Sequence, residues 1–162
     1  MLLTTCVFDA YGTLFDVNAA ARTAANEPNQ ETFKEVWPSV SNLWRMKQLQ
    51  YTWLRSITSS YIDFWTVTKD SLDYALEAHD LHENFDLKDR LLGLYWELQP
   101  YPEVSPVLKK LKTKGIKTAI LSNGSPEMLS AAVKSSNLFD VIDEIISVEK
   151  VRIFKPSSLV YE

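Results

Sequence analysis

The sequence is poor in cysteine, and it lacks any long apolar stretch. Cys6 is the single cysteine among 162 residues, so neither an intramolecular disulfide nor a cysteine-based metal site can form within the chain. No window reaches the roughly 18 consecutive apolar residues of a membrane span, and no basic segment precedes an apolar run at the N-terminus. The sequence therefore predicts a cytoplasmic protein that is not exported.

Charge of one sign is not concentrated anywhere in the chain. Lysine and arginine number 17 against 21 aspartates and glutamates, which gives a net charge of -4. No block of like charge is typical of a nucleic-acid-binding arm or a membrane-surface helix, so we expect neither nucleic acid nor membrane as a partner. The length and the 46% hydrophobic content fit one globular domain, or a domain that carries a smaller insert.

Three short apolar runs predict β-strands that each end in a loop. They are residues 3–9 (LTTCVFD), 116–121 (IKTAIL) and 144–148 (EIISV). The second run follows a lysine-rich helix that Gly115 closes, and it precedes a helix that Ser125 caps. Because a helix lies between successive strands, we predict an α/β fold with a Rossmann-like parallel sheet.

Between these runs, residues 16–98 have almost no glycine and show helical periodicity. On the helix around Arg45, one side carries the main apolar stripe, and the nearly opposite side carries a second group of residues. The stripe consists of Leu43, Met46, Trp53, Leu54 and Ile57, and the opposite group consists of Arg45, Leu49, Thr52 and Ser56. We therefore expect a helical insert at residues 16–98 within a core formed by residues 1–15 and 99–162.

Polar side chains follow each of the three predicted strands. Asp9 ends the first run, Ser122 and Asn123 follow the second, and Lys155 lies in the loop after the third. Ligands of open parallel sheets bind beyond the carboxyl ends of the strands. The convergence of a carboxylate, a hydroxyl, an amide and an ammonium at one rim predicts an active site there.

Four segments of the chain resemble the haloacid dehalogenase superfamily, and most closely its L-2-haloacid dehalogenases. They are DAYGTLFDV, LWRMKQLQYTWLR, AILSNGSP and FKPSSLVYE, in this order. The resemblance implies a Rossmann-like core, a helical cap inserted after the first strand, and Asp9 as a nucleophile. It implies hydrolysis of short L-2-haloalkanoic acids, as small-molecule substrates, to D-2-hydroxy acids through an aspartyl ester. No metal or organic cofactor is expected.

Tyr11 favours this reaction over phosphate chemistry. Phosphatases similar to this fold carry a second carboxylic acid two residues after the nucleophile, where it protonates an alkoxide leaving group. A departing halide is a stable anion that needs no proton. Tyr11 at that position also removes negative charge from a site that has to accept a substrate carboxylate.

The resemblance assigns roles to further residues. Lys155 is expected to keep Asp9 ionised, and Thr13 to donate a hydrogen bond to the same carboxylate. Ser122 is expected to bind the substrate carboxylate. The remaining expected contacts are Arg45, Asn123 and Phe64 around the halide, and Leu49, Trp65 and Tyr161 along the pocket.

Two alternatives stay open from the sequence: a phosphatase of the same superfamily, and a non-catalytic remnant that binds a partner through its sheet edge. Family members continue beyond the loop at Lys155 with further strand and helix units, so the resemblance predicts a truncated core with weak or no turnover. The first strand would then be an exposed apolar edge. Such an edge favours pairing with another chain, and a homodimer is therefore also expected.

Overall fold

The sheet has three parallel strands in the order β1-β2-β3, which confirms the predicted α/β class. The computed structural model describes residues 3–162, in which β1 spans Thr5–Phe8, β2 spans Lys117–Ser122 and β3 spans Glu144–Ser147. β2 lies in the centre of the sheet, and four of its six residues are buried. Its position between the other two strands brings three strand ends to one edge.

Two helices supply the connections that a parallel sheet requires. Helix α5 (Val104–Thr113) packs on β2, and helix α6 (Pro126–Ser135) packs on β3. Gly115 follows α5 with a φ of 72°, a left-handed conformation that favours glycine. The Ser125 hydroxyl accepts a hydrogen bond from the Met128 amide at 3.4 Å, so the predicted helix cap is confirmed. Two short 3-10 helices, η1 (Val148–Lys150) and η2 (Ser158–Val160), complete the chain as described.

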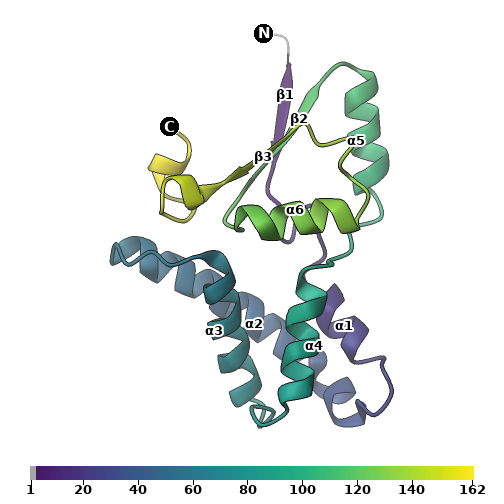
Figure 1. Ribbon diagram of the computed structural model, residues 1–162, viewed down its shortest axis with the longest axis vertical. Coiled ribbons are helices and arrows are strands. Elements are labelled where there is room, and N and C mark those ends of the chain that lie inside the picture. Colours follow the sequence, from purple (N-terminus) through teal and green to yellow (C-terminus); the bar gives the residue numbers. More distant parts are fainter. Residues whose placement is uncertain (1–2) are drawn as a thin grey trace.

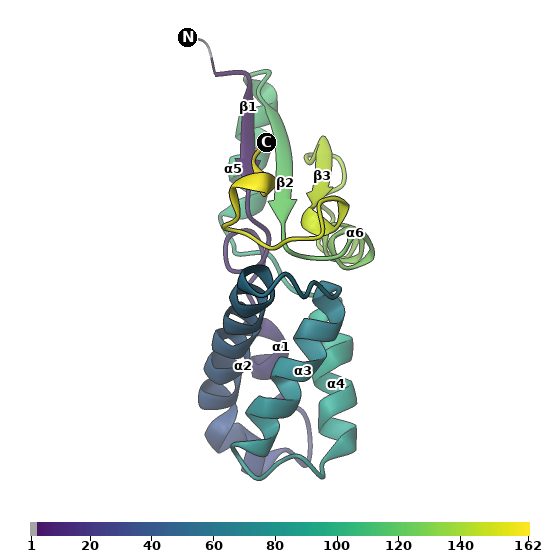
Figure 2. The same ribbon diagram turned by 90° about the vertical axis from the view of Figure 1, so that its left-hand side faces the viewer.

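The other four helices form a bundle beyond the carboxyl ends of β1 and β2 (Figures 1 and 2). They are α1 (Ala19–Ala24), α2 (Glu31–Ile57), α3 (Phe64–Glu77) and α4 (Phe85–Tyr95). Helix α2 packs along α3, and α1 packs against both α2 and α4. None of the helices within residues 3–162 has the length and apolar character that crossing a membrane requires.

Helix α2 buries a different face from the one that its apolar residues suggested. Met46, Trp53, Leu54 and Ile57 of the predicted stripe are 46–80% exposed. The buried residues of the helix are Phe33, Val40, Ser41, Trp44, Gln48 and Thr52. Polar atoms on this face have partners, since Trp44 donates to the Thr68 carbonyl at 2.9 Å and Gln48 donates to the Thr68 hydroxyl at 2.7 Å. Hydrogen bonding thus offsets the cost of burying polar side chains.

Strand β1 is an edge strand in the described part of the chain, where it pairs with β2 alone. Val7, in the middle of β1, is 56% exposed, whereas Ile120, at the centre of β2, is fully buried. The carboxyl end of β1 behaves differently, because Ala10, Tyr11 and the loop that follows enter the buried core. The edge strand therefore leads directly into the buried core of the molecule.

Candidate active site

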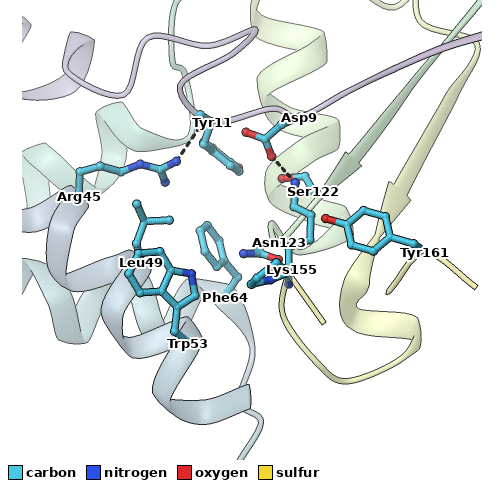
Figure 3. A pocket seen from close by; sticks show the side chains of 11 residues that line it. Asp9, Tyr11, Arg45, Leu49, Trp53, Phe64, Ser122, Asn123, Lys155 and Tyr161 are labelled. Atoms are coloured by element: carbon cyan, nitrogen blue, oxygen red, sulfur yellow. Dashed lines mark hydrogen bonds and ion pairs between the residues drawn. The ribbon is translucent and has the colours of Figure 1, made fainter. Parts of the chain in front are cut away.

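The predicted strand-end residues come together in one pocket of about 350 Å³ (Figure 3). Asp9 follows β1, Ser122 ends β2, and Lys155 comes from the segment after β3. Helices α2 and α3 close the pocket from the other side. The lining residues are Asp9, Tyr11, Arg45, Leu49, Trp53, Phe64, Ser122, Asn123, Lys155, Pro156 and Tyr161.

Lys155 and Asp9 form the polar centre of this pocket. The Lys155 ammonium lies 2.5 Å from Asp9 Oδ1 and also donates to the Leu121 carbonyl at 2.8 Å. The Lys155 backbone N–H donates to Asn123 Oδ1 at 2.9 Å, so both ends of the residue are held by the sheet. The Thr13 hydroxyl lies 3.5 Å from Asp9 Oδ2, at the limit of a hydrogen bond. The carboxylate is 36% exposed and thus accessible from the pocket.

Arg45 brings a second cation to the pocket from helix α2. One guanidinium nitrogen donates to the Tyr11 carbonyl at 2.7 Å, and the other donates to Gln48 Oε1 at 2.8 Å. Gln48 is itself fixed by its amide nitrogen, which donates to the Tyr95 hydroxyl at 3.0 Å. The planar guanidinium is therefore oriented by two acceptors, a geometry that a lysine could not reproduce.

Tyr11 forms an aromatic wall where a phosphatase would carry a second carboxylate. Its ring stacks on Tyr95 at 5.6 Å, lies 5.6 Å from the ring of Phe64, and is 3% exposed. Within the described residues, the buried Tyr11 hydroxyl has no hydrogen-bond partner. Burial raises the pKa of Tyr11 well above its ordinary value, Tyr95 and Asp9 raise it further, and Arg45 opposes them. The phenol is therefore neutral at physiological pH.

Positive charge prevails in the pocket. Arg45 and Lys155 are cationic and Asp9 is anionic, so the three charged side chains that line the pocket give a net charge of +1. Burial also raises the pKa of Tyr95, which packs behind Tyr11, and this phenol adds no negative charge. A small anion is the kind of ligand that this balance favours. In residues 3–162, no three histidine, cysteine, aspartate or glutamate side chains gather closely enough to hold a metal ion.

The loop after β2 is pinned so that its backbone closely approaches Tyr11. The Ser122 hydroxyl accepts from the Gly124 N–H at 3.2 Å, and the Ser147 hydroxyl donates to the Gly124 carbonyl at 2.6 Å. A Cβ atom on Gly124 would lie 2.8 Å from Cε2 of Tyr11 and 3.0 Å from a methyl carbon of Leu129. Glycine is thus required here by the space that the Tyr11 ring occupies.

Most of the residues predicted for the site lie in the pocket, but Trp65 does not. Its ring packs edge-on against Trp96 at 4.9 Å, because Phe64 and Trp65 are successive residues of α3 and point about 100° apart. Leu49, Phe64 and Tyr161 line the pocket, whereas Thr13 touches Asp9 from outside the lining.

Two lining residues, Trp53 and Pro156, were not expected. The helical spacing gave a signal for Trp53 that its assignment to the apolar stripe hid: it follows Leu49 by four residues on α2, so the two lie only about 40° apart around the helix. Pro156 directly follows Lys155, and its place in the lining follows from that of the lysine.

The fold and this site define a hydrolase of the haloacid dehalogenase-like class. The chain belongs to that family, since residues 3–162 match the family described as haloacid dehalogenase-like hydrolase. It is 46% identical over 157 residues to (S)-2-haloacid dehalogenase 1 of Pseudomonas sp. (strain CBS-3), which covers 97% of this chain and 67% of that protein. It is 43% identical over 160 residues to (S)-2-haloacid dehalogenase 4A of Burkholderia cepacia, covering 99% of this chain and 67% of that protein.

Solved structures agree with these relatives. The L-2-haloacid dehalogenase from Xanthobacter autotrophicus superposes with a TM-score of 0.85 at 40% identity, covering 99% of this chain and 62% of that one. The same enzyme with chloropropionic acid covalently bound gives a TM-score of 0.83 at 40% identity, with the same coverage of the two chains. The chain thus spans about two thirds of the length of the curated relatives that it matches.

Proposed function

We propose that this protein hydrolyses short L-2-haloalkanoic acids to D-2-hydroxy acids. The observation that carries the proposal is the Asp9 carboxylate, which faces the pocket while paired with Lys155 at 2.5 Å, with the neutral Tyr11 ring beside it. The (S)-2-haloacid dehalogenase relatives, at 35–46% identity, support the choice of substrate class.

The reaction has two steps. Asp9 attacks the α-carbon from the side opposite the halogen, which forms a carbon–oxygen bond, breaks the carbon–halogen bond and inverts the centre. Water then adds to the carboxyl carbon of the aspartyl ester, so the original Asp9 oxygen leaves with the product. The oxygen of that water remains on Asp9, one of its protons goes to the hydroxyl of the product, and the other goes to solvent.

The other residues of the site bind and orient the substrate. Lys155 pairs with the Asp9 carboxylate and holds it toward the pocket. Ser122 and Asn123 donate to the substrate carboxylate and the halide, and Arg45 stabilises the halide as charge develops on it. Four further residues, Tyr11, Leu49, Phe64 and Tyr161, exclude water from the reacting carbon.

Residues 16–98 act as a cap on a core formed by residues 1–15 and 99–162. Support comes from Arg45, which reaches from helix α2 to the carbonyl of Tyr11 in the loop after β1. Pairing of two copies through β1 and a cytoplasmic location remain predictions from the sequence, and light scattering tests the first of these.

The test measures chloride release from (S)-2-chloropropionate and the position of an oxygen label. A single turnover in H₂¹⁸O should place ¹⁸O on Asp9 and leave the product hydroxyl unlabelled, which mass spectrometry of the Asp9 peptide detects. Asp9→Asn should lower kcat by roughly 10⁴-fold or more. Label in the product hydroxyl, or full activity of Asp9→Asn without a lag, would rule out the ester mechanism.

A matched control is available at Asp80, which is exposed and has a φ of 57° that asparagine adopts readily. Asp80→Asn removes the same charge from the surface and should leave kcat unchanged. Release of phosphate from a small phosphoester, dependent on magnesium and on Asp9, would instead favour the phosphatase alternative.

A further inference from the structure

One side of helix α2 bridges two loops of the pocket. Arg45 and Ser56 are eleven residues apart, which is about three helical turns, so they project from the same side of the helix. Arg45 donates to the Tyr11 carbonyl in the loop after β1. Ser56 contacts Phe154, in the segment that carries Lys155. The helix thus holds the nucleophile loop at one point and the lysine segment at the other.

The Ser56 hydroxyl forms hydrogen bonds with both backbone polar groups of Phe154. The Phe154 N–H donates to the Ser56 hydroxyl at 3.1 Å, and that hydroxyl donates to the Phe154 carbonyl at 3.4 Å, across 98 residues of sequence. A serine hydroxyl can do both at once because it has one donor and two acceptor lone pairs. The Phe154 ring is fully buried and lies 4.9 Å from the ring of Tyr61 and 6.3 Å from that of Phe64. Phe154 is therefore held from the helical side by both its backbone and its ring.

The next residue in the chain is held from the opposite side. The Lys155 N–H donates to Asn123, and its ammonium reaches Asp9 and the Leu121 carbonyl, all at the end of the sheet. Two adjacent residues are thus anchored to different layers of the molecule. A shift of Phe154 moves the Lys155 backbone directly, because they share a peptide bond.

We propose that Ser56 is a positioning residue that sets the placement of Lys155 against Asp9 through its two hydrogen bonds to Phe154. The consequence for turnover rests on the proposed function, whereas the placement itself does not. Loss of the hydroxyl should let residues 153–156 move while the rest of the pocket keeps its shape.

The experiment compares Ser56→Ala, Ser56→Thr and the wild-type chain, with Ser39→Ala as the matched control. Ser39 lies on the same helix 17 residues before Ser56, where its exposed hydroxyl meets His79. Two readouts do not depend on activity: hydrogen exchange of the Lys155 amide by NMR, and the rate at which an acylating reagent labels the Lys155 amine. The third is kcat and KM for chloride release.

Ser56→Ala should raise the exchange and labelling rates of Lys155 by about tenfold. It should lower kcat by a similar factor with KM within about twofold, since the nucleophile rather than the substrate loses its partner. Ser56→Thr, which keeps the hydroxyl, should restore all three, and Ser39→Ala should match the wild type throughout.

Unchanged Lys155 exchange and labelling in Ser56→Ala would overturn the proposal, even if chloride release fell. If the wild type releases no chloride while the two lysine readouts respond as expected, the positioning role stands and the proposed function fails. A thermal melt of each variant separates a local change from general unfolding, which would accelerate exchange at Ile120 in the centre of the sheet as well.

Discussion

Gly124→Ala is expected to damage the pocket although it replaces no side chain of the site. The new methyl carbon would lie 2.8 Å from Cε2 of Tyr11, whereas carbon atoms normally approach to about 3.5–4.0 Å. Either the ring or the Gly124 backbone therefore has to move by about 0.7 Å or more. Leu129 offers some relief, because the atoms that it presents belong to the end of a flexible side chain.

The Tyr11 ring has little room to retreat. Phe64 and Tyr95 each lie 5.6 Å away between ring centres, and Arg45 holds the Tyr11 carbonyl at 2.7 Å. Gly124 is also tied at its N–H and its carbonyl. Overpacking of this kind costs about 1–3 kcal/mol. Because Tyr11 borders Asp9 in the pocket, we also expect kcat to fall by about tenfold.

Gly93→Ala provides the matched control. Gly93 is an exposed residue of α4, and a Cβ placed there meets no atom within 4 Å. Alanine should stabilise that helix by about 0.5–1 kcal/mol. Urea unfolding and chloride release of the two variants make the comparison. If Gly124→Ala proved as stable and as active as the wild type, the reasoning from the close approach to Tyr11 would be refuted.

Substitutions at three further positions test separate parts of the structure. Tyr11→Phe removes a buried hydroxyl that has no partner within residues 3–162, so urea unfolding should show unchanged or higher stability, by up to about 1 kcal/mol. Arg45→Lys keeps the charge but cannot meet both acceptors, and kcat for chloride release should fall at least about tenfold. Asp63 caps α3: burial favours a higher pKa, but hydrogen bonds from Thr66 hold the pKa below its ordinary value. The charged cap therefore stabilises the fold above the pKa of the unfolded chain, and this contribution is lost as the pH falls through the folded pKa. In urea unfolding, Asp63→Ala should lower the free energy of unfolding by about 1 kcal/mol at neutral pH and by less near pH 3. Asp63→Asn should restore part of this stability, and the restored part should not depend on pH.

The sheet and the polar residues at its strand ends could be predicted because local signals were enough. Short apolar runs, a closing glycine at position 115 and a capping serine at position 125 defined the strands and crossovers. The rule that ligands bind beyond the strand ends then located Asp9, Ser122 and Lys155 together. Each inference used neighbouring residues and a general property of parallel sheets.

The orientation of helix α2 could not be obtained in the same way. Counting apolar residues selected the side with Trp53 and Ile57, which is largely exposed, because the buried side contains Gln48 and Thr52. Gln48 is buried against partners on α3 and α4, which are distant in the sequence, and Thr52 donates to the Leu49 carbonyl of α2 itself. The sequence also placed Trp65 in the pocket, whereas its ring packs against Trp96. The reason is related, since only the packing of α3 decides which of two successive aromatic residues faces the pocket.

The net positive charge of the pocket affects both the binding of the substrate anion and the release of the product anions. The whole chain carries a net charge of -4, but charges more than about 8 Å away are largely screened at physiological ionic strength, so a distant haloacid is affected little by this charge or by the charge of the pocket. The rate of substrate binding therefore gains little from long-range electrostatic steering. Both products of the proposed reaction are also anions, and the same two cations that admit the substrate retain them. Accumulating chloride should then act as a competitive inhibitor.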